Sequence, residues 1–200
     1  MVSDTSRGQA YTLEALVSAL LLLGTIVFAL QATAVTPQSA STADAHSQAQ
    51  LERVAGGVLD AARERGAIRA TVLYWDNAEA EFHGLGRDQS AYENGALPTA
   101  FGAMLNESFG DHAVVYNVDV RYYDQTGAVQ TRTVLDSGTP SDDAARVTAL
   151  VTLYDDDVLY LGDETESTRP LSNATFYAPD SSPASGLYNV VTVEVVLWTT

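Results

Sequence analysis

Residues 13–30 read LEALVSALLLLGTIVFAL, and this stretch decides how the 200-residue chain is organised. It carries one charged residue, Glu14, and its apolar character continues to Val35. A helix needs about 20 apolar residues to cross a bilayer, and this one is apolar on all sides rather than along one stripe. We therefore expect residues 13–35 to form a single membrane-inserted helix, preceded by a short cytoplasmic leader at residues 1–12.

The remaining sequence is strongly acidic. The chain has 26 Asp and Glu residues against 10 basic ones, all of them arginine, and a formal net charge of -16. Nucleic-acid phosphates require basic patches, so a nucleic-acid partner is not expected. The absence of cysteine excludes disulfides, thiolate catalysis and cysteine-based metal sites. The lysine-free, Asp-rich composition resembles that of proteins from extreme halophiles, especially haloarchaea.

Three interpretations of the apolar segment are open. The simplest is a single-pass anchor. A secretory signal peptide is favoured by Ala32-Thr33-Ala34, which matches an A-x-A cleavage site, although the apolar run exceeds the usual length of about 7–15 residues. The third rests on Arg7, Gly8 and Glu14, because a basic residue and a glycine precede the run and a carboxylate lies in its first turns. This arrangement resembles the class III signal peptides of archaeal type IV pilins and related pilin-like proteins.

The pilin resemblance implies a processing site at Arg7, Gly8 and Gln9. A prepilin peptidase would cut on the cytoplasmic side of the apolar run, so the helix would be kept and would pack with other pilin-like subunits. A cut after Gly8 leaves Glu14 sixth in the mature chain, whereas the glutamate of the family is usually fifth, which fits a cut after Gln9.

The resemblance also implies a role for Glu14 in subunit assembly, where it would meet the freed N-terminal amine of a neighbour. A carboxylate in an apolar region costs roughly 2.5–3.5 kcal/mol at a helix centre, so it needs a partner. The alternative is an interfacial acid without a role. Beyond the leader, segments such as TVLYWD, VTLYDDD, FYAPD and YNVVTVEVV resemble an uncharacterised haloarchaeal family of pilin-like membrane proteins, a family that brings no known activity.

The fold class expected after the membrane segment is α+β. Residues 36–66 predict an extracytoplasmic helix, because Thr36-Pro37 suits a helix start and Gly66 suits its end. Residues 67–200 predict an acidic, antiparallel β head with one short helix at 97–109. The expected strands are 68–75, 79–83, 114–123, 128–135, 146–154, 158–161 and 189–198, the last in the centre of the sheet. Residues 79–83 are expected to pair with 68–75, and residues 114–135 to form a hairpin that turns at 124–127.

Few residues of the head offer chemistry. Asp155, Asp156 and Asp157 are the best candidates for a Ca2+ site, although a solvated acidic face is the plainer interpretation. No catalytic motif or phosphate-binding loop occurs, so neither an enzyme nor another cofactor is expected. His83 is expected to be a hydrogen-bonded structural residue. Asn106 and Asn173 begin N-x-S/T triplets and are candidate glycosylation sites.

The sequence therefore predicts a pilin-like structural subunit, a minor one, of an archaeal type IV pilus or a related surface or secretion apparatus. It would reside in the cell membrane as a single-pass protein with an extracytoplasmic C-terminal domain, or in a surface filament. The alternative is a membrane-anchored binding or accessory module that does not polymerise.

Overall fold

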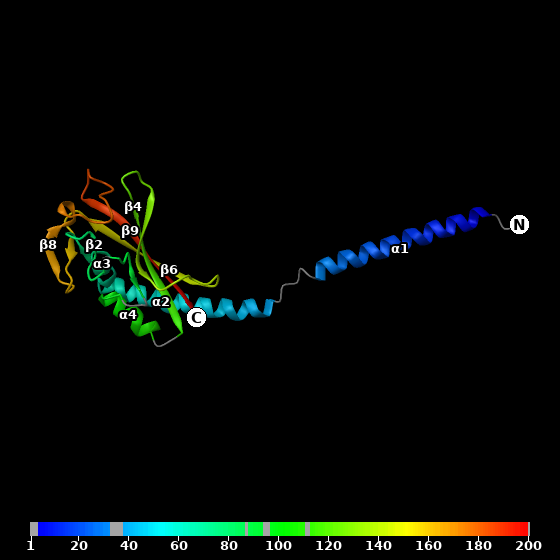
Figure 1. Cartoon of the computed structure of the whole chain (residues 1–200), viewed down its shortest axis with the longest axis horizontal. Coiled ribbons are helices and arrows are strands. Elements are labelled where there is room, and N and C mark those ends of the chain that lie inside the picture. Colours follow the sequence, from blue (N-terminus) through cyan, green and yellow to red (C-terminus); the bar gives the residue numbers. More distant parts are fainter. Residues whose placement is uncertain (1–3, 33–37, 87, 94–96, 111–112, 200) are drawn as a thin grey trace. The chain divides into compact units, whose positions relative to one another are not determined.

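The computed structural model describes residues 4–32, 38–86, 88–93, 97–110 and 113–199 (Figure 1). The chain divides into two compact units, Met1–Asp44 and Ala45–Thr200, and each is described by itself. Within the described residues, no helix combines the length and the apolarity that crossing a membrane requires.

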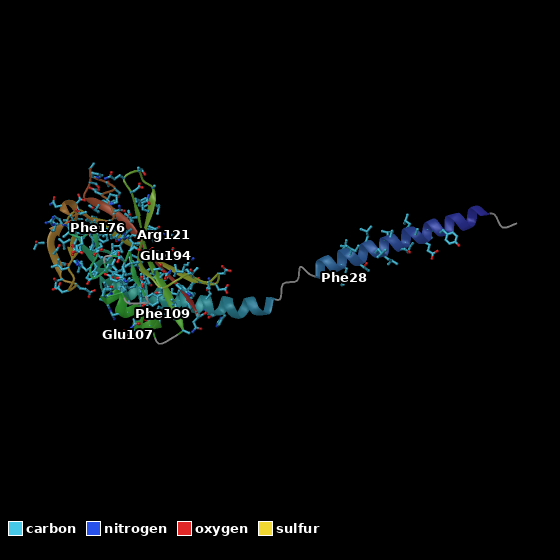
Figure 2. All side chains as sticks on the ribbon, in the orientation of Figure 1. Phe28, Glu107, Phe109, Arg121, Phe176 and Glu194 are labelled. Atoms are coloured by element: carbon cyan, nitrogen blue, oxygen red, sulfur yellow. The ribbon has the colours of Figure 1, made fainter. Side chains whose placement is uncertain are left out.

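The first unit consists mainly of helix α1, Asp4–Ala32. Its described side chains run without a break from Leu13 to Phe28, and every one of them is exposed. Figure 2 shows them standing out on both sides of the ribbon, with Phe28 labelled. The expected helix at 13–35 therefore begins earlier, at Asp4, and residues 33–37 lie outside the described part.

Helix α2, Gln38–Glu64, corresponds to the predicted helix at 36–66. Gly66 follows two residues after its end, and its φ of 73° is the left-handed conformation that glycine adopts most readily. The next residues correct a prediction, because Ala67–Val72 form helix α3 rather than the start of a strand. Ile68, Thr71 and Val72 are buried, and their spacing is also that of one face of a helix.

Helix α4, Ala100–Phe109, is the short helix expected at 97–109. It starts after Pro98 because Thr99 is the N-cap and its Oγ1 accepts a hydrogen bond from the Gly102 N–H at 3.3 Å. Glu164 reaches the same helix end from a distant turn, where its Oε1 accepts from the Ala100 N–H at 2.7 Å. The described part of the head thus contains two short α-helices, α3 and α4, where one short helix was predicted.

A five-stranded sheet forms the centre of the head, in the order β3-β5-β4-β9-β6. The predicted hairpin is confirmed as β4, Val114–Tyr123, and β5, Val129–Asp136. The last strand, β9 at Leu187–Thr199, lies between β4 and β6, Ala145–Tyr154, and pairs antiparallel with both. The prediction of a central C-terminal strand is therefore confirmed.

The prediction of an antiparallel β head is confirmed in part, because the five-stranded sheet is mixed. Strand β3, Tyr92–Glu93, pairs parallel with β5. The chain passes through α4 and β4 between these two strands, so no tight turn fixes their relative direction.

Two small antiparallel sheets complete the head. Trp75–Asp76 (β1) pairs with Glu81–Phe82 (β2), which confirms part of the pairing expected between 68–75 and 79–83. Val158–Tyr160 (β7) pairs with Glu166–Pro170 (β8), and the 3-10 turn η1, Leu171–Asn173, follows. Strand β8 was not predicted, because its sequence ESTRP has no apolar residue.

One hydrophobic core joins the helices to the sheet. It takes Leu59 from α2, Ile68 from α3 and Phe101 from α4, together with sheet residues such as Val118 and Val193. We call this side of the sheet the core face and the opposite side the outer face. Val196 and Trp198 alternate with the core residues of β9, so they lie on the outer face, where they pack with Ala144 and Val115.

Candidate functional site

The residue expected to act in assembly, Glu14, lies on α1 with its side chain exposed. Within the described residues no hydrogen bond or ion pair to it is found. The described part of the helix around and beyond it is mostly apolar, and its large side chains are exposed, from Leu13 at 70% to Phe28 at 74%. The helix therefore presents one carboxylate near the start of a continuous apolar surface.

The proposed processing residues Arg7, Gly8 and Gln9 belong to α1, but their side chains lie outside the described residues. The same holds for Ala32, where the helix ends, and residues 33 and 34 are not described at all. The two competing cleavage sites therefore remain predictions from sequence.

The two glycosylation triplets occupy different local structures. Asn106 is exposed but sits inside α4, where its carbonyl accepts from the Gly110 N–H at 2.7 Å, and Ser108 is half-buried. Asn173 is the last residue of η1 and Thr175 lies in the loop that follows it, and both are exposed. A transferase needs access to an exposed segment, so the loop triplet presents the more accessible side chain in the folded head.

The acidic run forms the turn between β6 and β7, and its three members differ. Asp157 accepts from the guanidinium of Arg69 and, at 2.7 Å, from the Tyr154 N–H. Asp156 is exposed, whereas Asp155 is half-buried and its Oδ1 has no hydrogen-bond partner in the described structure. No described group of three or more acidic or histidine side chains has the arrangement of a metal site. The Ca2+ site therefore stays a prediction, with Asp157 already engaged by an arginine.

The interpretation of His83 as a hydrogen-bonded structural residue is confirmed. Its Nε2 lies 3.0 Å from the carbonyl oxygen of Tyr160, and its Nδ1 lies 3.7 Å from a carboxylate oxygen of Asp76. The ring also packs edge-on against Tyr74, with 5.0 Å between the ring centroids. His46 is exposed on α2, and His112 lies outside the described residues.

Most tyrosines of the head pack in or against the core, whereas Tyr123 and Tyr154 are exposed. Burial, followed by the charges of Asp180 and Asp155, raises the pKa of Tyr188 to about 12. Burial also raises the pKa of Tyr177, whose hydroxyl donates to the Val72 carbonyl at 3.1 Å. Both hydroxyls therefore stay protonated well above neutral pH, and that of Tyr177 acts as a hydrogen-bond donor.

Sequence reasoning missed an ion triad on the outer face. Glu194 is 8% exposed, and its Oε1 lies 2.9 Å from a guanidinium nitrogen of Arg121 and 3.3 Å from one of Arg146 (Figure 2 labels Arg121 and Glu194). The three residues come from adjacent strands β4, β9 and β6. A glutamate inside an apolar strand was visible in the sequence, but its two partners depend on the strand order.

A groove of about 300 Å³ was also missed. Its lining comes from α2, the end of α4 and the outermost residues of β4 and β9, and it includes Leu51, Val54, Phe109 and Val114. Among the described residues that line it none is charged, although the chain is strongly acidic. These residues are too far apart in sequence for a local pattern to bring them together.

The comparisons with known proteins give one match. The sequence profile of the Family of unknown function (DUF7288) matches residues 7–197. The chain belongs to this family. The match spans helix α1 and nearly all of the head, so membership in DUF7288 covers both units. No curated protein and no solved structure matches the chain.

Proposed function

We propose that this DUF7288 member is a pilin-like structural subunit of a type IV pilus or a related surface or secretion apparatus. In this proposal, helix α1 holds the chain in the membrane before assembly and then packs with the same helix of other subunits. The acidic head faces the outside of the cell and the other components.

One observation carries the proposal: an apolar run within α1 that has a single carboxylate, Glu14, near its start and is preceded by Arg7-Gly8. The described side chains of this run end at Phe28, and the apolar run of the sequence extends further, to Val35. Burying a leucine-sized side chain contributes about 1.5–3 kcal/mol, so such a surface favours lipid or other apolar helices over water. The charged carboxylate of Glu14 would be costly in such surroundings unless a cation lies next to it. The N-terminal amine that cleavage frees on a neighbouring subunit would be such a cation.

The state of the N-terminus tests the proposal directly. The full-length chain is expressed in its native host, and the mass of its N-terminal peptide is measured in membrane and sheared-filament fractions. The expected result is a chain that begins at Gln9 or Ala10. Recovery of an uncut chain starting at Met1, or of one starting at Val35, would overturn the proposal, the first in favour of a membrane-anchored module and the second in favour of a secreted one.

Assembly is tested separately through Glu14. The Glu14→Ala chain is expected to be processed and to stay in the membrane but to be lost from the filament fraction. Glu52→Ala, at an exposed acid of α2, is the matched control and should assemble like the wild type. Normal assembly of Glu14→Ala would show that the carboxylate has no role.

A further inference from the structure

Strand β6 is an edge of the five-stranded sheet, with β9 on one side only. The side chain of Asn189 in β9 bonds both the N–H and the C=O of Tyr123, so the odd-numbered residues of β4 direct their backbone groups at β9. In an antiparallel sheet, successive residues of a strand direct their backbone N–H and C=O groups alternately to one side of the strand and to the other. The same alternation continues through β9 into β6. The odd-numbered residues of β6 therefore direct their backbone groups at β9, and the even-numbered residues direct theirs away from the sheet.

Only one end of this edge is protected. The Thr152 carbonyl accepts from Arg69 at 2.7 Å, and the Tyr154 N–H donates to Asp157 at 2.7 Å. In the described part of the chain, no hydrogen bond reaches the outward backbone groups of Arg146, Thr148 or Leu150, and all three residues are exposed, Leu150 at 61%. We call these three residues the open edge. Unpaired edge groups are a template for a further strand.

We infer that the open edge pairs with the open edge of a second copy of this chain, antiparallel about a two-fold axis at Thr148. Of the antiparallel registers available, this one uses all the free groups. It sets Thr148 opposite its own counterpart and Arg146 opposite Leu150, and each copy contributes the same patch, as a two-fold interface requires.

The side chains and charges of the strand agree with this partner. On the outer face the aliphatic stem of Arg146 would cover the exposed Leu150 of the other copy while its guanidinium stays on Glu194. Residues 145–154 contain no Asp or Glu, although the whole chain has 26. This edge is therefore a place where two strongly acidic copies can approach with little direct repulsion.

The ends of the strand make the pairing dependent on salt. Asp142 and Asp143 precede β6, and residues 155–157 are all aspartate. Antiparallel pairing brings the first group of one copy near the second group of the other. The screening length falls from about 10 Å at 0.1 M salt to about 3 Å at 1 M, so self-association should rise as salt is added. The inference concerns the head alone and holds whether or not α1 takes part in a filament.

Single cysteines in the naturally cysteine-free full-length chain test the pairing. In detergent at about 1 M KCl, oxidation of Thr148→Cys should give several-fold more disulfide-linked dimer than Thr131→Cys, an equally exposed site on β5. Directly opposed residues with hydrogen-bonded backbones lie about 5.5 Å apart at Cα, within the disulfide range of about 4.4–6.8 Å. The yield for Thr148→Cys should fall at 0.1 M KCl.

A mixture fixes the register. Arg146→Cys and Leu150→Cys chains should cross-link when mixed but not when oxidised separately, because only the mixture places the two cysteines opposite each other. The inference is overturned if Thr148→Cys cross-links no more than Thr131→Cys. It is also overturned if either single variant cross-links as well as the mixture.

Discussion

Glu194 shows how one residue sets the character of a sheet face. A buried carboxylate loses hydration, and attraction to neighbouring charges offsets that loss only when the geometry is good. Here two guanidiniums lie within 3.3 Å, while Arg121 and Arg146 themselves keep 46% and 56% of their side chains exposed. The charges thus stay partly solvated. The outer face is apolar at Val196 and Trp198 and ionic at Glu194, which distinguishes it from the core face and fixes the register of β4, β9 and β6.

Asp124 makes stability depend on pH at the turn of the β4–β5 hairpin. The side-chain hydrogen bonds from Thr126 and Gln130, with backbone bonds from Thr126 and Ala128, lower its pKa from 3.8 to about 2. A depressed pKa in the folded state gives stability that is present above the unfolded value and lost as the pH falls through the folded one. We expect the urea midpoint of the wild type to exceed that of Asp124→Asn near pH 5, and the gap to shrink between about pH 4 and pH 2.

The control for this prediction is Asp156→Asn. Asp156 is exposed and has no hydrogen bond within the described structure, so its variant should keep the pH dependence of the wild type. A gap between the wild type and Asp124→Asn that is as wide at pH 2 as at pH 5 would contradict the assigned role of the hairpin carboxylate.

At the scale of elements, replacing each of two helical glycines by alanine should change the free energy of unfolding in opposite directions. Alanine is favoured over glycine in a helix interior by about 1 kcal/mol. A Cβ on Gly57 of α2 would meet nothing within 4 Å, so Gly57→Ala should stabilise by about 0.5–1 kcal/mol. A Cβ on Gly102 of α4 would lie 2.1 Å from the carbonyl oxygen of Leu97, and this is backbone that cannot swing aside. Gly102→Ala should therefore destabilise, as measured by equilibrium urea unfolding.

Thr99 provides the reference for that comparison. Its hydroxyl caps α4 and lies 2.8 Å from the hydroxyl of Thr71. Thr99→Ser keeps this hydroxyl, so it should keep most of the free energy of unfolding. A larger loss in Gly102→Ala would then come from the clash with Leu97 and not from a weakened cap. Equal unfolding midpoints for Gly102→Ala and Gly57→Ala would show that the loop before α4 adapts to the extra methyl group.

The sequence predicts a helix or a strand correctly wherever the helical or the strand periodicity of its apolar residues runs long enough to exclude the other. Residues 116–122 alternate strictly between apolar and polar side chains, and a turn at Asp124–Gly127 follows, so the pattern predicts the hairpin. Residues 68–75 are β-branched and aromatic, and this composition predicts a strand. The run is short, and Ile68 and Val72 satisfy helical spacing equally well, so packing against α4 decided between the two.

Features that depend on long-range partners left no local signal. Strand β8 has no apolar residue, and its pairing with β7 depends on a turn in which Glu164 adopts a φ of 58°. For the candidate site, the position of Glu14 in the apolar run was readable from sequence. The ion triad at Glu194 and the open edge of β6 were not, because both depend on which strands are neighbours in the sheet.

At the scale of the whole molecule, composition separates two kinds of surface. Residues 13–35 carry one charge, whereas the rest of the chain carries most of a net charge of -16. Like charges spread over a compact surface repel one another, and unfolding moves them apart. The repulsion therefore destabilises the folded head at low ionic strength, and added salt should reduce it.

The unfolding midpoint of the chain should consequently rise as KCl increases from about 0.1 M to about 2 M, because screening shortens from about 10 Å to below 3 Å. Thermal unfolding in detergent, followed by circular dichroism, measures this rise.

The triple variant Asp142→Asn, Asp143→Asn and Asp156→Asn removes three exposed charges, so it should be more stable than the wild type in about 0.1 M KCl and gain less from added salt. Sodium sulfate at equal ionic strength separates screening from exclusion of salt at the surface, since only exclusion makes sulfate the stronger stabiliser. Identical salt slopes for the wild type and the triple variant would place the origin of the salt effect in hydrophobic burial rather than in the acidic surface.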